Sequence, residues 1–403
     1  SPTERSVLTV ARRLCHRVLN SGDPFNGLPK HGPGAVSTGE RSDEKHLFRR
    51  WYDLLMEVFP YDQWFSVNAG GVCDTFHRFG QWPSVRTGTA KVVLVPKDSR
   101  GPRLISCEPL EYQWIQQGIK SIMMDTIESH PFTKGKVNFT DQEVNRRLAL
   151  QGSLTGEWAT LDMKEASDRV SVHHVSELFP DRWCEALFAS RSTHTKLPDG
   201  RVVHLKKMAP MGSAVCFPIE SLVFWSLCVA GLIVTCGVPE HEALSQTHVY
   251  GDDIVIDSEY HAAIITTLES FGLKVNRQKC CTTGFFRESC GMDAYRGICV
   301  TPVRCKRPWN SRRSPDTLAS WVALSNNLWT AGCWTTAEML ADCIKKQWGN
   351  TIPTTPDVIG CVSFVRPELP MDVPRHVPRG YNKRLQRMEI RGHTSRPSLV
   401  KTR

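Results

Sequence analysis

The chain has 403 residues and a mass of 45.4 kDa, with 40% hydrophobic and 23% charged residues. This composition is typical of a soluble globular protein, and the length allows two to three domains at about 150 residues each. It excludes a peptide-sized scaffold, a collagenous chain and a wholly disordered one.

The first part of the chain shows helical periodicity and two strand-like runs. Helices are predicted over residues 42–58 and 112–127. Strands are predicted over 91–95, with the sequence KVVLV, and at 104–105, with a polar turn between them. That turn carries three cations suited to a triphosphate, although plain solvation would also account for them: Lys97, Arg100 and Arg103.

From residue 159 onward short strands alternate with helices, which is an α+β pattern rather than a repeat. We predict a strand over 159–162, a helix near 172–178 and a hairpin over 249–256. The run 221–237 has 17 residues without a charge, at the lower edge of membrane-spanning length, and acids flank it instead of lysine or arginine. This favours a buried core helix over a membrane span.

The C-terminal segment after residue 357 is rich in proline and arginine and has little periodicity. Residues 375–403 contain nine basic residues and one acid, whereas the net charge of the whole chain is +9. The body of the protein is therefore nearly neutral, and we expect most of the segment after residue 357 to be irregular or to take its structure from a partner.

The sequence HVYGDDIVI predicts a hairpin whose turn holds Gly251 and two adjacent acids, Asp252 and Asp253. Adjacent carboxylates repel one another, so a divalent cation is their natural partner, whereas an ordinary acidic turn is the alternative. The segment ATLDMKEASDRVS favours the metal site. There, Asp162 ends an apolar strand and can supply a third carboxylate around two hard cations.

Two further segments point to nucleotide chemistry. Asp168 lies six residues after Asp162, near a helix start, where a helix N-cap formed with Ser167 is the alternative role. Gly212 and Ser213 form a flexible loop before the apolar helix, which lets the backbone approach a nucleotide closely.

The order of basic loop, DxxxxxD, MGS helix and YGDD resembles motifs F, A, B and C of a right-handed RNA-dependent RNA polymerase. The match is closer to the replicase catalytic (beta) subunit of levivirus-like single-stranded RNA bacteriophages. The resembling stretches follow one another between residues 90 and 330: VPK to EP (95–109), LDxxxASDxxS (161–171), LPDG (197–200), MG to ESLxFW (211–225), YGDDI (250–254), FRESCG (286–291), VTP (300–302) and NNLW (326–329).

The fold that this resemblance implies is an α+β right hand. Fingers are expected at residues 1–150, including the basic loop 91–109 where nucleotides enter. The palm, with an antiparallel sheet, is expected at 151–300 with a fingers insertion at about 174–208. The thumb and the basic tail would occupy 301–403.

The resemblance also implies roles for single residues. Asp162, Asp252 and Asp253 would hold two Mg²⁺ or Mn²⁺ ions. Asp168, next to Ser167, would read the ribose 2′-hydroxyl, and the bulky aromatic expected of a reverse transcriptase is missing there.

Lys97, Arg100 and Arg103 would neutralise the triphosphate, and Gly212 with Ser213 would position the template base and the nucleotide. Lys279 matches the place of a general acid for pyrophosphate, with Lys274 and Arg277 as nearby alternatives. The FRESCG stretch resembles the hairpin that grips the primer terminus, although Cys290 is equally suited to be a core thiol.

Three positions depart from the general polymerase pattern, since Cys216 and Glu220 stand where Thr and Asn are usual and Pro210 stands where Ser is often found. Glu220 is shared with the phage replicases and so supports the subgroup. Replicases of this group are longer than 403 residues, so terminal portions that dock partners are expected to be absent or shortened.

The resemblance implies an RNA template and product, nucleoside triphosphates and, by kinship, host elongation factors Tu and Ts with a ribosomal protein, in the bacterial cytoplasm and without a membrane. The alternatives are a partial replicase chain, a membrane-anchored protein, or a silent RNA-binding protein that uses the tail and the basic cluster 304–313. The fifteen cysteines lack a CxxC pair and indicate reduced thiols. A zinc site is a minor alternative for a group of them: Cys280, Cys281, Cys290, Cys299 and Cys305.

Overall fold

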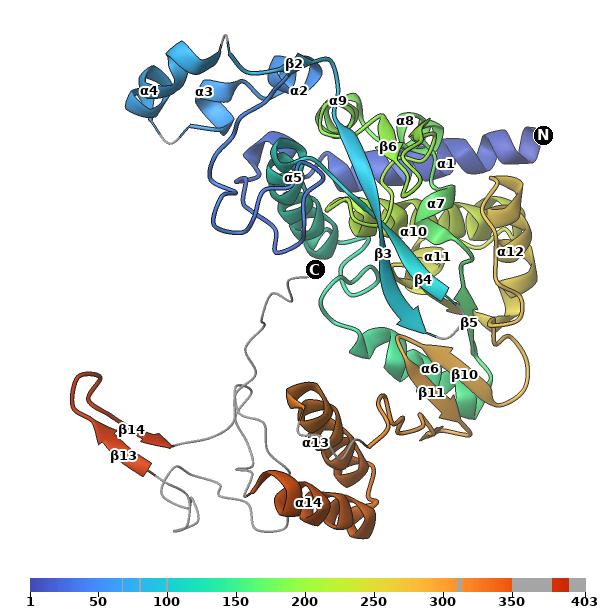
Figure 1. The fold of residues 1–403 in the computed structure, drawn as a ribbon. Helices are drawn as coiled ribbons and strands as arrows, with labels where there is room; N and C mark the ends of the chain where they lie inside the picture. Colours follow the sequence, from blue (N-terminus) through green and yellow to red (C-terminus); the bar gives the residue numbers. More distant parts are fainter. Residues whose placement is uncertain (67, 80, 99–100, 310–313, 350–378, 391–403) are drawn as a thin grey trace. The chain divides into compact units, whose positions relative to one another are not determined.

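The computed structural model describes residues 1–66, 68–79, 81–98, 101–309, 314–349 and 379–390. Its chain forms two compact units, Ser1–Val300 and Thr301–Arg403, and each is described by itself. The fold is mixed, with helices and mostly antiparallel sheets in the first unit (Figure 1). This confirms the predicted α+β class.

The described chain contains the following α-helices: α1 (Pro2–Leu19), α2 (Asp53–Val58), α3 (Tyr61–Trp64), α4 (Ala69–Phe79), α5 (Leu110–Ser129), α6 (Glu143–Thr155), α7 (Ala166–Arg169), α8 (Val172–Leu178), α9 (Asp181–Ala189), α10 (Cys216–Thr235), α11 (Glu240–Ser245), α12 (His261–Ser270), α13 (Pro315–Thr330) and α14 (Trp334–Trp348). Two short 3-10 helices are η1 (Pro24–Asn26) and η2 (Ser258–Tyr260). The strands are β1 (Trp51–Tyr52), β2 (Ser84–Val85), β3 (Thr89–Asp98), β4 (Gly101–Cys107), β5 (Trp158–Asp162), β6 (His194–Lys196), β7 (Val202–His204), β8 (Thr247–Tyr250), β9 (Asp253–Asp257), β10 (Phe286–Ser289), β11 (Met292–Tyr295), β12 (Ile298–Cys299), β13 (Arg379–Asn382) and β14 (Arg387–Ile390).

A three-stranded antiparallel sheet in the order β5-β9-β8 lies at the centre of the first unit. Each strand has three consecutive buried residues, and β9 pairs with a strand on both sides. The register places Asp162 opposite Asp253, so the acidic ends of β5 and β9 meet at one edge of the sheet.

Helix α10 is the main apolar element of the first unit. α1, α12 and β8 all pack against it, which explains why the sequence shows no polar face there (Figure 1). By length and composition it is also the helix of the described chain that could cross a membrane, yet 83% of its most apolar window is buried within the protein. The expectation of a core helix is confirmed.

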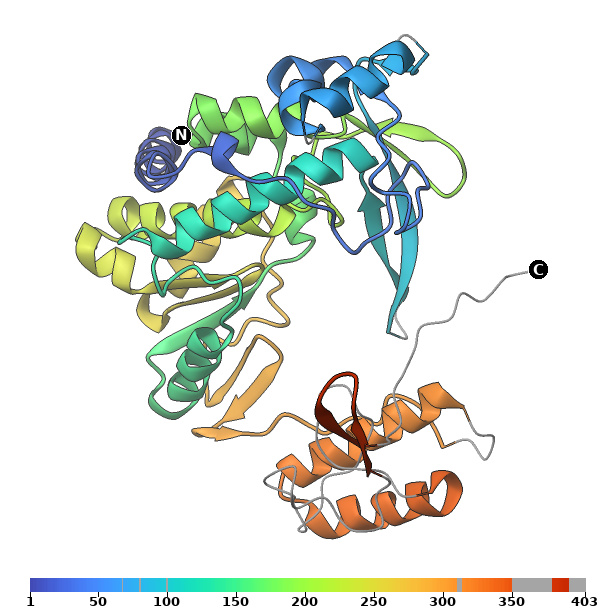
Figure 2. The same cartoon turned by 90° about the vertical axis from the view of Figure 1, so that its left-hand side faces the viewer.

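The second sheet of this unit has the order β4-β3-β6-β7, in which β3 and β6 are parallel. Figure 2 shows the β3–β4 hairpin as a long ribbon that reaches away from the helices. It confirms the strands predicted at 91–95 and 104–105, and the helix predicted over 112–127 is α5.

The helix predicted over 42–58 is wrong for residues 42–52, because α2 begins only at Asp53 and residues 51–52 form β1. A buried lysine explains the difference. The Nζ atom of Lys45 donates hydrogen bonds to the carbonyl oxygens of Gly32 and Gly34, at 2.6 and 2.7 Å. Those tertiary contacts hold the segment as a loop despite its apolar spacing.

The second unit contains a helical hairpin, α13–α14, with a small core formed by Leu318, Val322 and Ile344. The strands β13 and β14 form a separate antiparallel pair within the basic tail. The rest of the tail, from residue 375 to 378 and from 391 to 403, lies outside the described residues.

The burial of α10 predicts a large stability effect for truncation of its side chains. Leu227→Ala removes a fully buried side chain and should lower the free energy of unfolding by about 2–5 kcal/mol. Leu154→Ala, on helix α6 with the side chain 63% exposed, is the matched control and should change it by less than about 0.5 kcal/mol. Urea denaturation followed by circular dichroism measures both, and equal effects would contradict the buried placement of α10.

Candidate active site

The tip of the β8–β9 hairpin holds the acidic residues in place. Gly251 has φ +63°, and a Cβ atom there would lie 2.2 Å from the ring of Phe217 on α10. Its N–H donates to Oγ of Ser221, also on α10, at 3.1 Å. The turn therefore requires glycine, and the core helix fixes the position of Asp252 and Asp253.

Asp162, at the end of β5, is held by two side chains from the segment after α12. Nδ2 of Asn276 donates to Oδ2 of Asp162 at 2.8 Å, and Nζ of Lys279 lies 3.4 Å from Oδ1. The backbone N–H of Asn276 also donates to the Asp162 carbonyl at 2.8 Å. The predicted general acid, Lys279, is thus an ion-pair partner of a predicted metal ligand.

Asp253 is held from the other side by the β10–β11 hairpin, which contains the FRESCG stretch. The N–H of Cys290 donates to Oδ2 of Asp253 at 3.1 Å. Cys290 has φ +50°, a backbone conformation that L residues rarely adopt, and Arg146 of α6 donates to its carbonyl at 3.2 and 3.1 Å. The hairpin turn and α6 therefore position one carboxylate of the site.

Negative charge accumulates around these residues. Burial, and then the charges of Asp252 and Glu288, raise the pKa of Asp253 to about 7. Burial, and then the charges of Asp252 and Asp168, raise the pKa of Glu220 on α10 to about 8. A cation at this place would relieve the repulsion, and carboxylate oxygens are the ligands that Mg²⁺ prefers.

Within the described residues, no group of three or more His, Cys, Asp or Glu side chains is arranged to hold a metal ion. Asp162 contacts Asn276 and Lys279, and Asp253 accepts from Cys290. Carboxylate oxygens are nevertheless the donor type that a hard divalent cation prefers. The two-ion site stays a prediction.

Ser167 and Asp168 lie inside the short helix α7, whose N-cap position is Glu165 with φ +55°. The alternative of an N-cap formed by Ser167 and Asp168 is therefore wrong. Instead, Oδ1 of Asp168 accepts from Nζ of Lys207 at 2.6 Å, and Ser167 is buried.

The loop before α10 is tied to β4 and α5. Gly212 has φ +116°, and a Cβ atom there would lie 2.3 Å from the carbonyl oxygen of Ser106. The hydroxyl of Ser213 donates to Oε1 of Gln116 at 3.1 Å, and the same oxygen accepts from the N–H of Ala214 at 3.2 Å. The glycine is required here, and the loop is anchored rather than free.

A cleft of about 800 Å³ collects most of the predicted residues. Its walls come from β4, β5, α7, the loop before α10, the hairpin tip and the segment after α12. The predicted site residues that line it are Arg103, Asp162, Ser167, Asp168, Gly212, Ser213, Asp252 and Lys279.

The other predicted residues are placed differently. Asp253 lies beside the cleft with its carboxylate turned toward Cys290. Lys97 is on β3, and Arg100 falls outside the described residues. Arg103 is the one of the three predicted cations that lines the cleft among the described residues. It lies on β4 and is exposed.

Sequence reasoning missed three side chains that support the site: Gln116, Lys207 and Asn276. Each comes from a segment remote in sequence from the residue that it contacts. Asn276 lies in the segment GLKVNRQK beside the candidate general acids Lys274, Arg277 and Lys279. Its side-chain amide, a hydrogen-bond donor for a carboxylate, could have been recognised there.

Comparison with known proteins gives consistent matches. The sequence model of the family described as RNA replicase, beta-chain, matches residues 7–342. The RNA-directed RNA polymerase subunit beta of Enterobacteria phage SP is 32% identical over 360 residues, which are 86% of this chain and 59% of that protein. The protein of the same name from Escherichia virus Qbeta is 37% identical over 212 residues, 53% of this chain and 34% of that one.

These coverages mean that the chain spans about a third to three fifths of the length of these two relatives. Among solved structures, the RNA-dependent RNA polymerase of a human picorbirnavirus matches with 13% identity and a TM-score of 0.44, over 64% of this chain and 56% of that one.

The raised pKa values of Asp253 and Glu220 predict how stability depends on pH. Both acids bind their proton more tightly in the folded state than in the unfolded one, so without divalent ions stability should fall as pH rises from 6 to 8. Mg²⁺ should raise the melting temperature at pH 8 by about 2 °C or more, and by less at pH 6. Thermal scans in EDTA and in Mg²⁺ measure this.

The Asp252→Asn variant should weaken both effects, because the Asp252 charge contributes to both raised pKa values. Asp257→Asn, at the far end of β9, is the matched control and should keep them. A Mg²⁺ effect of equal size at the two pH values would contradict the interpretation.

Proposed function

The chain belongs to the RNA replicase beta-chain family, and from this premise we propose that it copies an RNA template into RNA from nucleoside triphosphates. The observation that carries the proposal is the acidic edge of the β5-β9-β8 sheet, which opens into a cleft that also holds Arg103, Asp168 and the Gly212 loop. Three carboxylates beside a nucleotide-sized cleft suit nucleotidyl transfer.

In this proposal Asp162, Asp252 and Asp253 hold two divalent cations, Mg²⁺ or Mn²⁺. Bound there, the ions supply activation of the attacking 3′-hydroxyl and charge stabilisation of the pyrophosphate. The protein's own contribution is to present the carboxylates on adjacent strand ends, fixed by Ser221 and by the Cys290 amide.

The remaining cleft residues bind and orient the nucleotide. Arg103, which is exposed, faces the triphosphate, and Lys97 and Arg100 are proposed to join it. Asp168 accepts a hydrogen bond from the ribose 2′-hydroxyl, which selects RNA precursors.

Ser167, Gly212 and Ser213 complete the nucleotide-binding surface. The anchored loop of Gly212 and Ser213 positions the template base and the nucleotide above the acids. Lys279 donates a proton to the leaving pyrophosphate once its contact with Asp162 is released.

We also propose fingers at 1–150, palm at 151–300 with an insertion at about 174–208, and thumb at 301–403. The name "subunit beta" of the relatives denotes one chain of a larger replicase. Host elongation factors Tu and Ts and a ribosomal protein are the proposed partners, in the cytoplasm of a bacterial host.

The proposal predicts that labelled nucleotides are incorporated on an RNA template in Mg²⁺ or Mn²⁺. The assay is run both with and without bacterial extract. Asp252→Asn should lower the rate by about 100-fold or more, because a metal-site carboxylate becomes neutral. Asp257→Asn is the matched control, since Asp257 on the same strand caps η2 away from the cleft and should keep the rate. Dependence on extract would indicate host subunits.

Absence of incorporation under all these conditions, with RNA binding intact, would instead support a silent RNA-binding protein or a partial replicase chain.

The basic tail predicts a salt-dependent contribution to RNA binding. Residues 375–403 carry nine basic residues and one acid, so their deletion should weaken binding and flatten the dependence of log affinity on log salt. Each lost phosphate contact reduces that slope by about 0.7 for single-stranded RNA. Fluorescence anisotropy at several salt concentrations measures it, and an unchanged slope would rule out the tail as an RNA contact.

A further inference from the structure

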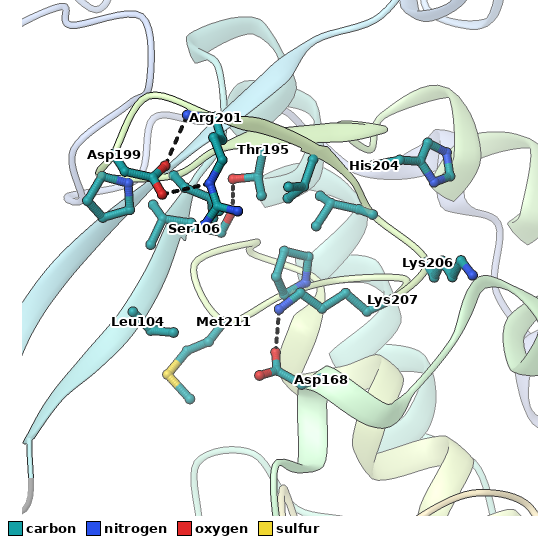
Figure 3. Close-up of a pocket in the computed structure, with 16 residues that line it drawn as sticks. Leu104, Ser106, Asp168, Thr195, Asp199, Arg201, His204, Lys206, Lys207 and Met211 are labelled. Atoms are coloured by element: carbon teal, nitrogen blue, oxygen red, sulfur yellow. Dashed lines mark hydrogen bonds and ion pairs between the residues drawn. The ribbon is translucent and has the colours of Figure 1, made fainter.

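A second cavity, of about 730 Å³, adjoins the nucleotide cleft (Figure 3). It lies between the β3–β4 hairpin, the β6–β7 hairpin and residues 205–211. Leu104, Asp168 and Met211 line both cavities, whereas Lys207 lines only the second one. Lys207 therefore reaches the Asp168 carboxylate from outside the nucleotide cleft, with Nζ 2.6 Å from Oδ1.

The backbone of Lys207 is held firmly. Arg191 is buried, and its guanidinium donates to three carbonyl oxygens of the segment 205–208, including that of Lys207 at 3.0 Å. The N–H of Met208 donates to the carbonyl of Val170 at 2.8 Å, two residues after Asp168. The segment that carries Lys207 is thus fixed against the helix that carries Asp168.

The contact leaves half of the carboxylate available. Lys207 occupies Oδ1, while Oδ2 of Asp168 makes no hydrogen bond to the residues that the structure describes. The side chain of Asp168 is 49% exposed, so without a partner it would rotate among several orientations. A single fixed acceptor recognises a hydroxyl better than a rotating one, because less conformational freedom is lost on binding.

We propose that Lys207 is a positioning residue that orients Asp168 toward the ribose and so sets the preference for ribonucleotides over 2′-deoxyribonucleotides. The inference rests on the proposed polymerase function and adds a residue outside the recognised motifs. Because the ion pair is half exposed, it contributes little to stability, and variants of Lys207 should fold.

The test compares ATP with dATP in RNA-templated incorporation by Lys207→Met, Lys207→Arg and Lys206→Met. Lys207→Met should lower kcat/KM for ATP about threefold to fivefold, mainly through KM, and leave dATP nearly unchanged. Lys207→Arg keeps the cation and should restore most of the preference. Lys206→Met is the matched control, because Lys206 is exposed and points away from Asp168 (Figure 3).

A double-variant cycle shows whether Lys207 acts through Asp168. Asp168→Asn combined with Lys207→Met should discriminate no worse than Asp168→Asn alone. An unchanged ATP preference in Lys207→Met, or an equal loss in Lys206→Met, would overturn the proposal.

Equilibrium binding of ATP and dATP to the full chain separates this inference from the polymerase proposal. If the wild type incorporates no nucleotide, the polymerase proposal fails. A binding preference for ATP that Lys207→Met reduces would still support Lys207 as the residue that orients Asp168. Equal binding of ATP and dATP by the wild type would overturn the proposed role of Lys207.

Discussion

The crowding of carboxylates at one edge of the central sheet is the constraint around which the first unit is organised. Antiparallel pairing puts Asp162 and Asp253 opposite each other, and the tight turn adds Asp252 beside them. Glu220 approaches from the core helix, and burial raises its pKa together with that of Asp253. Such an arrangement is unfavourable unless cations or hydrogen-bond donors offset it, and perturbed carboxylates grouped in this way are typical of functional sites.

The surrounding elements supply a separate hydrogen-bond donor to each of several carboxylates. Asp162 receives an amide and an ammonium from the segment after α12, and Asp253 receives a backbone N–H from a strained hairpin turn. Asp168 forms an ion pair with Lys207. Two of these donors, Lys207 and Lys279, are side chains on the surface, so their contacts with the carboxylates can be exchanged for others.

The sequence was informative wherever the signal is local. Short apolar runs predicted β3 and β5, the uncharged stretch predicted α10, and the acids fell on strand ends because apolar strands precede them. It failed where distant segments decide the outcome. Lys45 donates to two backbone carbonyls, which keeps the predicted helix from forming. Gln116, on another helix, accepts a hydrogen bond from Ser213. Neither contact produces a periodic pattern in the sequence.

A buried polar network links these distant contacts. Gln116 binds the Ser213 loop through Oε1 and donates through Nε2 to the carbonyl of Ser190, at 2.7 Å. The next residue, Arg191, holds the segment of Lys207, and the hydroxyl of Ser192 donates to buried Glu108 at the end of β4.

Burial raises the pKa of Glu108 to about 6, while the hydrogen bond from Ser192 and the charge of Arg191 lower it. Ser190, Arg191 and Ser192 thus join β4, the loop before α10 and the segment that carries Lys207. Because buried polar groups are costly unless all of them are paired, this network fixes one arrangement of the cleft walls. The geometry of the cleft is therefore set in part by residues that do not line it.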